Sequence, residues 1–139
     1  MELFQVHDEH RLFISPAITD WDVLNCHGVD TVIDLDGTID SGVPTLPNKC
    51  LYIYFPIFDE DLPNLNKLDA VGSLGASLVS SGHCVLSHCG MGYNRSALVA
   101  GVILHKLGLS GPDIVRRIQE RRPGALYNEC FAAYLESLA

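Results

Sequence analysis

The segment VLSHCGMGYNRS, residues 85–96, predicts an apolar strand, a glycine-containing loop and the start of a helix. Cys89 opens the loop and Arg95 closes it, with five residues between them. A loop of this length can curl so that its backbone N–H groups point inward, and a helix that begins at about Ser96 directs its positive end to the same place. The segment therefore predicts an anion-binding site.

The residue types in this loop suit a phosphate group. Gly90 and Gly92 let the backbone turn tightly and leave room for a ligand. The Arg95 guanidinium offers a planar fork of donors to two phosphate oxygens. Cys89 would lie beneath the phosphorus, where the positive potential favours a thiolate. We expect the bound group to contact the loop through Gly90, Met91, Gly92, Tyr93, Asn94 and Arg95.

The length and composition of the chain predict one globular domain, residues 1–139. Because 47% of the residues are hydrophobic, a sizeable core can form. The net charge of −8 argues against nucleic acid or an anionic membrane as a general partner. The longest apolar run, residues 97–104, is too short to cross a bilayer, and no basic leader with an apolar core begins the chain. We expect a monomer without a membrane partner.

The five cysteines are scattered, odd in number and without the paired spacing of a metal site. This pattern favours a reducing compartment, so we expect a cytoplasmic protein without bound metal or another cofactor. Cys84 and Cys50 are expected on neighbouring strands. Either could in principle trap an oxidised Cys89 as a disulfide, and the alternative is that both are small buried core residues.

Apolar segments alternate along the chain between strand-like and helix-like patterns. Turn residues such as Gly28, Pro56 and Gly108 separate them. This alternation predicts an α/β fold with a central, mostly parallel sheet of four to five strands and helices on both faces. The expected strands are 11–14, 31–35, 51–55 and 84–87, and the expected helices are 21–28, 66–80, 96–106, 111–120 and a last one that follows Asn128.

The pattern His-Cys-x5-Arg-Ser, with Gly92 inside it, resembles the signature of the cysteine-dependent protein tyrosine phosphatases. The size of the chain and its downstream pattern resemble the compact dual-specificity branch, and the resemblance covers nearly the whole chain. It implies that Cys89 is the nucleophile and that Arg95 holds the phosphate. It also implies that Ser96 donates to the departing thiolate and that His88 supports the loop.

The resemblance also implies a general acid on a loop upstream of the signature, after a strand and a proline. The segment Phe55-Pro56-Ile57-Phe58-Asp59 resembles that loop, so we expect Asp59 to protonate the leaving oxygen, with Asp61 as the alternative.

The resemblance implies a phosphomonoester hydrolase that acts on phosphoproteins or phosphopeptides. Asn94 replaces the commoner small residue before Arg95 and resembles the RNA 5′-triphosphatase branch of the fold, so an RNA 5′-phosphatase stays an alternative. A phosphoinositide phosphatase is a further alternative, disfavoured because no Lys or Arg lies between Cys89 and Arg95.

Two other functions remain open from the residues. The segment 31–38, with Asp34 and Asp36, resembles the first motif of haloacid-dehalogenase-like phosphatases, in which the first Asp is the nucleophile beside Mg²⁺. The downstream acidic pair of that family is missing. The other alternative is a catalytically inactive phosphate-binding module.

A basic cluster stands out in this acidic chain and consists of Arg116, Arg117, Arg121 and Arg122. It is either a solvated helix face or a rim for acidic substrates near the pocket.

Overall fold

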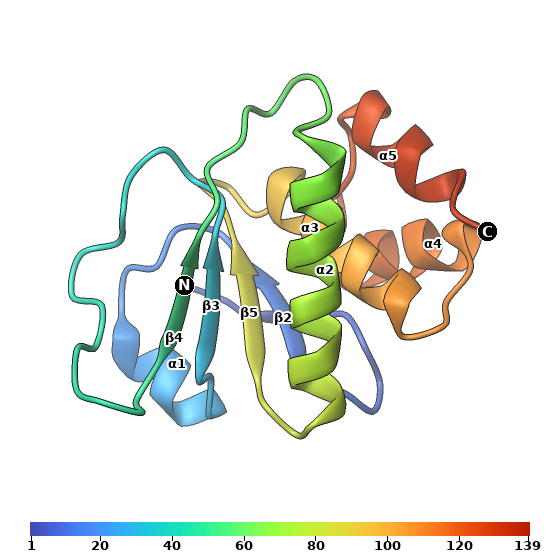
Figure 1. Cartoon of the computed structure of the whole chain (residues 1–139). Helices are drawn as coiled ribbons and strands as arrows, with labels where there is room; N and C mark the ends of the chain where they lie inside the picture. The colour runs from blue at the N-terminus through green and yellow to red at the C-terminus, as the bar shows by residue number, and fades with distance from the viewer.

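A five-stranded sheet forms the centre of the computed structural model, which describes residues 1–139 (Figure 1). The strand order is β1-β2-β5-β3-β4; β1 is antiparallel to β2, and the other neighbours are parallel. The predicted α/β class and the mostly parallel sheet are thereby confirmed. The strands are β1 (Phe4–Gln5), β2 (Leu12–Ser15), β3 (Thr31–Asp34), β4 (Leu51–Tyr54) and β5 (Val85–His88).

Helices cover both faces of the sheet, as predicted. Successive strand residues point to opposite faces, and the two core clusters follow this alternation. Ile33 and Val85 belong to the larger cluster under α2, α3, α4 and α5, whereas Val32 packs with Leu24 of α1 on the other face. The helices are α1 (Trp21–His27), α2 (Leu65–Ser80), α3 (Arg95–Lys106), α4 (Gly111–Arg121) and α5 (Glu129–Glu136).

Helix α3 is the buried helix of the fold, because every residue from Ser96 to Leu104 is buried. Helix α2 approaches it closely at two glycines. A Cβ atom on Gly72 would lie 2.4 Å from Val102 Cγ1, and one on Gly75 would lie 2.5 Å from Ile103 Cδ1. This contact fixes the position of α3, whose first turn follows the loop predicted to bind phosphate. None of the helices combines the length and hydrophobicity that a membrane span needs.

The parallel strands bring their carboxyl ends to one edge of the sheet. His88 of β5 stands in register with Ser15 of β2 and with Asp34 of β3, which in turn pairs with Tyr54 of β4. Ligand sites of open α/β sheets lie at this edge. The loops that follow β3, β4 and β5 therefore meet in one place.

Candidate active site

The loop between β5 and α3 wraps around the sulfur of Cys89. The residue is 2% exposed. Its Sγ accepts a hydrogen bond from the backbone N–H of Gly92 at 3.2 Å, and Ser96 Oγ lies 3.4 Å away. Gly92 has a φ of 75°, and a Cβ atom there would lie 2.7 Å from the backbone nitrogen of Pro16. Only glycine combines this conformation with so close an approach to the end of β2.

Helix α3 begins without a side-chain cap. Its N-cap residue, Asn94, makes no capping hydrogen bond, whereas Asp20, Asn64, Ser110 and Asn128 cap the other four helices. The N–H groups of the first turn of a helix have no partner within the helix. In α3 they are left available to a group that binds at the loop, where the positive end of the helix dipole favours an anion.

Arg95 lies beside the loop at the edge of a surface hollow. Its Nη1 donates long hydrogen bonds to the backbone oxygen of Leu35 at 3.4 Å, to Asp36 Oδ1 at 3.4 Å and to the oxygen of Ile57 at 3.5 Å. The hollow is lined by Asp36, Gly37, Pro56, Ile57, Phe58, Asp59 and Arg95. The loops after β3, β4 and β5 thus meet around the guanidinium.

Asp59 is held against the loop by two amide side chains. Asn94 Nδ2 donates to Asp59 Oδ2 at 2.9 Å, and Asn128 Nδ2 donates to Asp59 Oδ1 at 2.8 Å. Asn94 Oδ1 accepts the backbone N–H of Asn128 at 2.9 Å, which closes the group. Asp61 lies outside it and lines a neighbouring hollow with Glu60. The sequence predicted Asn128 only as a helix cap and gave no signal for its contact with Asp59.

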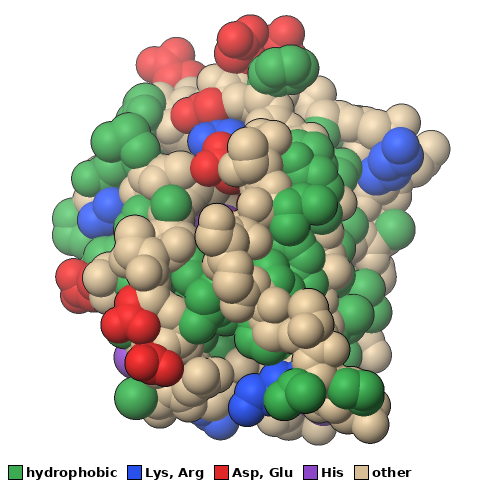
Figure 2. All heavy atoms as spheres, turned by 90° about the vertical axis from the view of Figure 1, so that its left-hand side faces the viewer, with side chains coloured by type: hydrophobic (Ala, Val, Ile, Leu, Met, Phe, Trp, Pro, Cys, Tyr) green, Lys and Arg blue, Asp and Glu red, His purple; other side chains and the backbone are tan.

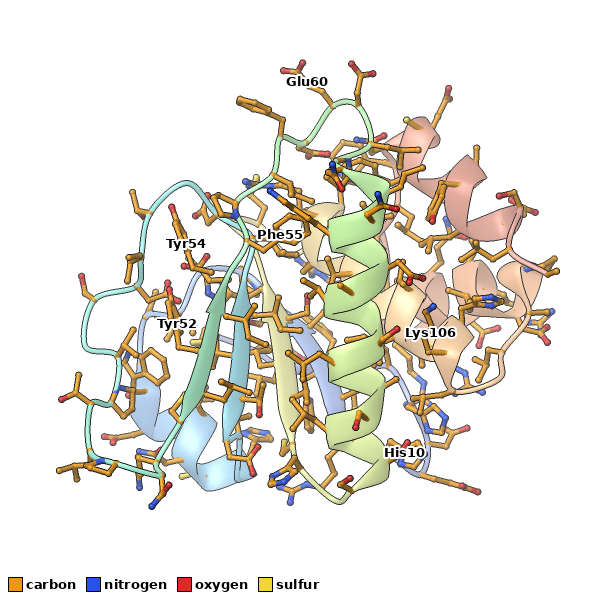
Figure 3. All side chains as sticks on the ribbon, viewed as in Figure 1. His10, Tyr52, Tyr54, Phe55, Glu60 and Lys106 are labelled. Carbon is orange, nitrogen blue, oxygen red and sulfur yellow. The ribbon has the colours of Figure 1, made fainter.

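The loop that carries Asp59, residues 58–61, forms an exposed, acidic end of the molecule. Glu60 projects from the top in Figure 3, and Figure 2 shows acidic and hydrophobic side chains together at this end. Phe58, which directly precedes Asp59, is hydrophobic and 82% exposed.

Arg122 supports the loop from its outer side. Its guanidinium carbon lies 4.5 Å from the ring centroid of Phe4 and 4.0 Å from that of Tyr93. Its Nη2 donates to the oxygen of Met91 at 3.1 Å, and its Nε donates to the oxygen of Gly92 at 3.4 Å. The rest of the basic cluster pairs with carboxylates: Arg117 and Arg121 with Asp8, and Arg116 with Asp113. These pairings favour a structural role over a substrate rim.

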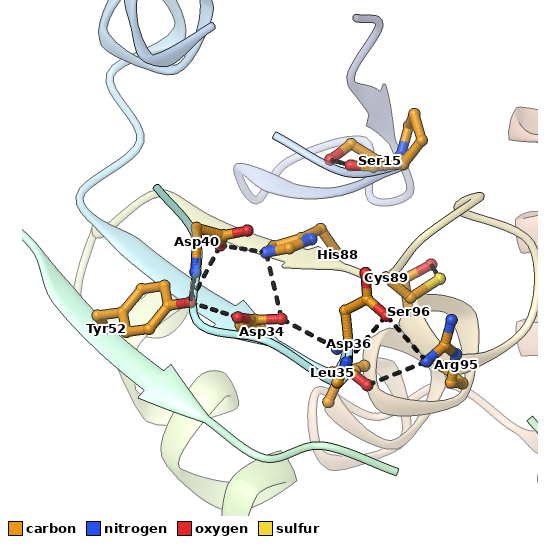
Figure 4. Close-up of polar contacts among 12 residues, drawn as sticks. Ser15, Asp34, Leu35, Asp36, Asp40, Tyr52, His88, Cys89, Arg95 and Ser96 are labelled. Carbon is orange, nitrogen blue, oxygen red and sulfur yellow. Dashed lines mark hydrogen bonds and ion pairs between the residues drawn. The ribbon is translucent and has the colours of Figure 1, made fainter. Parts of the chain in front are cut away.

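His88 precedes Cys89 in the chain, and its imidazole contacts carboxylates of the loop and strand before it, not the sulfur of Cys89. Its Nε2 is 2.6 Å from Asp40 Oδ2 and 3.6 Å from Asp34 Oδ1 (Figure 4). Asp40 belongs to the loop after β3, and no sequence pattern predicted its contact with His88.

The geometry does not fit an Asp nucleophile at residue 34. Asp34 has no exposed surface, and its oxygens accept the hydroxyl of Tyr52 and, at 2.9 Å, the backbone N–H of Asp36. Burial raises the pKa of Asp34, whereas a carboxylate nucleophile must be ionised and accessible to substrate. Asp36 contacts Arg95 instead of a second carboxylate.

Cys84 and Cys50, the two possible disulfide partners of Cys89, lie at the opposite end of the sheet. Cys84 precedes β5, so five residues of extended chain, about 16 Å, separate it from Cys89. Cys50 precedes Leu51, which is in register with Thr31, at the end of β3 opposite to Asp34. A disulfide needs Cα atoms within about 7 Å of each other. This placement argues against trapping and favours the alternative of small core residues. Cys84 is buried, and burial raises the pKa of its thiol to about 11.

No protein-family model and no curated protein sequence matches the chain. Its structure, however, is similar to solved phosphatase structures. Human DUSP28 matches with a TM-score of 0.79 and 24% identity over 96% of this chain and 90% of that chain. The mouse putative dual specificity phosphatase complexed with zinc tungstate matches with a TM-score of 0.79 and 24% identity over 96% of this chain and 84% of that chain.

Human tyrosine phosphatase-like serine/threonine/tyrosine-interacting protein matches with a TM-score of 0.76 and 22% identity, over 96% of this chain and 93% of that chain. These likenesses extend over almost the whole sheet and its helices. The chain therefore has the fold of these compact dual-specificity phosphatase structures.

Proposed function

We propose that this protein is a cysteine-dependent phosphatase that hydrolyses phosphomonoesters through a cysteinyl-phosphate. One observation carries the proposal. The buried sulfur of Cys89 receives the N–H of Gly92 at 3.2 Å, at the uncapped start of α3 and in the same loop as Arg95. Amide dipoles and a guanidinium directed at one point stabilise the charge of a phosphoryl group in transfer.

In the first step the Cys89 thiolate attacks phosphorus, and the bond from phosphorus to the leaving oxygen breaks. Arg95 and the loop N–H groups hold the three other oxygens. Asp59 gives its proton to the leaving oxygen, which departs as an alcohol or phenol. Asn94 and Asn128 hold the carboxyl group of Asp59 beside the loop for this transfer.

In the second step water attacks phosphorus and the bond from sulfur to phosphorus breaks. Asp59, now a carboxylate, takes a proton from the water, and phosphate leaves. The sulfur departs as a thiolate, which is stabilised by the hydroxyl of Ser96, 3.4 Å away, and by the N–H of Gly92. No metal ion takes part in either step.

The substrates we propose are phosphoproteins, with phosphotyrosine first and phosphoserine and phosphothreonine after it. Arg95 is the one cation that lines the hollow, beside Asp36 and Asp59. A single phosphomonoester suits this charge pattern better than the multiple phosphates of a phosphoinositide or an RNA 5′-triphosphate. The fold shared with dual-specificity phosphatases supports the same choice.

Hydrolysis of p-nitrophenyl phosphate tests the proposal. We expect turnover by the unmodified protein, no turnover by the Cys89→Ser variant, inhibition by vanadate and no effect of EDTA. Activity that survives the serine substitution, or that EDTA removes, would overturn the mechanism. Phosphate binding without turnover would identify a binding module instead.

A further inference from the structure

A buried polar cluster lies behind the candidate active site, where β3, β4 and β5 end (Figure 4). It consists of Asp34 from β3, Asp40 from the following loop, Tyr52 from β4 and His88 from β5. The side chains of Asp34 and His88 are fully buried, and that of Asp40 is 11% exposed. None of the steps proposed above uses Asp40 or Tyr52.

The hydrogen bonds of the cluster assign its protons. The Tyr52 hydroxyl donates to Asp34 and accepts the backbone N–H of Asp40 at 2.8 Å. Tyr52 Oη also lies 3.1 Å from Asp40 Oδ2, but a phenol has a single proton, and here it goes to Asp34. Asp40 Oδ2 is therefore left to accept from His88 Nε2 at 2.6 Å. We assign the hydrogen of this contact to Nε2, the ring nitrogen that faces the carboxyl oxygen.

This contact is the main restraint on the imidazole ring. The other ring nitrogen, His88 Nδ1, is buried and has no hydrogen-bond partner. Without Asp40, the imidazole would have only Asp34 Oδ1, at 3.6 Å, beyond hydrogen-bond reach. A buried polar group without a partner is costly, so loss of Asp40 would release the ring from its present orientation.

The position of His88 sets the start of the loop. Its backbone oxygen accepts the N–H of Leu35 at 3.0 Å, and the next N–H, that of Cys89, donates to Ser15 at 3.4 Å. A shift of the imidazole therefore acts on the residue that precedes the nucleophile. Figure 4 shows His88 between Asp40 and Cys89.

We propose that Asp40 is a positioning residue of the active site, which acts through His88 to fix the geometry of the loop that carries Cys89. Tyr52 and Asp34 support Asp40 from the opposite side. Burial raises the pKa of Tyr52, which keeps the proton on its hydroxyl. This role rests on the Cys89 chemistry proposed above.

Asp34, Asp40 and His88 are also ligand types for a metal ion, and their atoms lie within 4.8 Å of one another. Two ligands on one tetrahedral Zn²⁺ stand about 3.3 Å apart. The 2.6 Å between His88 Nε2 and Asp40 Oδ2 is a hydrogen-bond distance instead. The geometry therefore favours a proton between them.

The test compares Asp40→Ala, Asp40→Asn, His88→Ala and the double variant Asp40→Ala/His88→Ala. Asp30→Ala is the matched control, because Asp30 also pairs with a histidine, His83 at 2.8 Å, at the other end of the same sheet. For each variant we would measure kcat and KM with p-nitrophenyl phosphate, the alkylation rate of Cys89 and the melting temperature.

We expect Asp40→Ala to lower kcat by about tenfold or more and to change KM by less than about threefold. His88→Ala should lower kcat similarly, and the double variant should lose no more than about threefold beyond it, because the two residues act as one unit. Asp40→Asn keeps an acceptor oxygen and should retain about a third of kcat or more. Asp30→Ala should match the unmodified protein.

Independent losses in the double variant, or an unchanged kcat in Asp40→Ala, would overturn the proposal. Activity that rises or falls with added Zn²⁺ in an Asp40-dependent manner would assign the cluster to a metal and would also overturn it. If Asp40→Ala does not fold, nitrogen NMR of the unmodified protein decides: His88 Nε2 must carry hydrogen, and a bare Nε2 contradicts the proposal.

The alkylation rate separates this proposal from the proposed function. If the unmodified protein shows no Cys89-dependent turnover, the phosphatase proposal fails by itself. The effect of Asp40→Ala on alkylation of Cys89 still reports whether Asp40 shapes the loop. An alkylation rate equal to that of the Asp30→Ala control would then reject the positioning role.

Discussion

At the scale of single residues, the two amides around Asp59 link three parts of the chain. Asn94 belongs to the loop between β5 and α3, Asn128 precedes α5, and Asp59 follows β4. Both carboxyl oxygens accept hydrogen bonds, so the group is placed accurately beside the loop. One of these bonds must open when the proton moves to a leaving oxygen.

We predict that Asp59→Asn lowers kcat/KM, which reports the first step, about 100-fold on a phosphoserine peptide, whose alkoxide is a poor leaving group. The loss should be smaller with p-nitrophenyl phosphate, because p-nitrophenolate leaves without a proton. Asp61→Asn is the matched control and should change kcat/KM by less than about twofold, since Asp61 faces the neighbouring hollow. Equal losses for the two substrates, or a larger loss at residue 61, would reassign the acid.

At the scale of elements, the position of the loop between β5 and α3 depends on how closely α3 packs against its neighbours. The two glycines on the inner face of α2 leave no space for a side chain toward α3. Nine successive residues of α3, Ser96 to Leu104, are buried, so the helix is surrounded on all sides. The start of the helix cannot move without moving the core.

We predict that Gly72→Ala destabilises the protein by about 1–3 kcal/mol, because its Cβ would meet Val102 at 2.4 Å. The gain in helix propensity, about 1 kcal/mol, would offset part of this cost. Ser73→Ala, on the exposed side of the same helix, is the control and should be neutral or slightly stabilising. Urea unfolding of the three proteins measures the difference, and equal stabilities would contradict the close packing of α2 on α3.

Local patterns predicted most of the elements, because caps and apolar periods act over a few residues. Asn128 was expected to cap a last helix and does so. The strand β1 was not predicted, because two residues, Phe4 and Gln5, carry no recognisable alternation. Gly28 was expected to end the first helix, and it is the C-cap of α1, in the left-handed conformation.

Contacts between distant segments could not be predicted in the same way. Asp40 and His88 are 48 positions apart, and Asp40 lies in a loop without periodicity. The sequence left trapping of Cys89 by Cys84 or Cys50 open, because it does not show that β5 separates Cys84 from Cys89 and that Cys50 lies at the opposite end of the sheet. The roles of Cys89, Arg95 and Asp59 were predicted from a motif. The folded sheet places Arg95 and Asp59 around one hollow and bonds Asp59 to Asn94 of the loop that Cys89 opens.

At the scale of the whole molecule, burial of Asp34 links stability to pH. Its folded-state pKa is raised by burial, so the folded state binds a proton more tightly than the unfolded state. The stability from this proton is complete below the unfolded pKa, about 3.9, and is lost as pH rises through the folded pKa.

We predict that replacing Asp34 by Asn removes this dependence. The free energy of unfolding of the variant, minus that of the unmodified protein, should increase as pH rises from about 4 toward 7. Urea unfolding at several pH values in this range measures the difference. A difference that stays constant or decreases would mean that Asp34 does not hold the proton in the folded state.

The covalent intermediate provides the most direct test of the proposed chemistry. We would mix the protein with p-nitrophenyl phosphate, quench with acid within the first turnover and map the peptides by mass spectrometry. The account predicts a phosphoryl group on Cys89, which accumulates further in an Asp59→Asn variant because water then lacks its base. A phosphoryl group on Asp34, or turnover by a Cys89→Ser variant without any phosphorylated residue, would contradict the account.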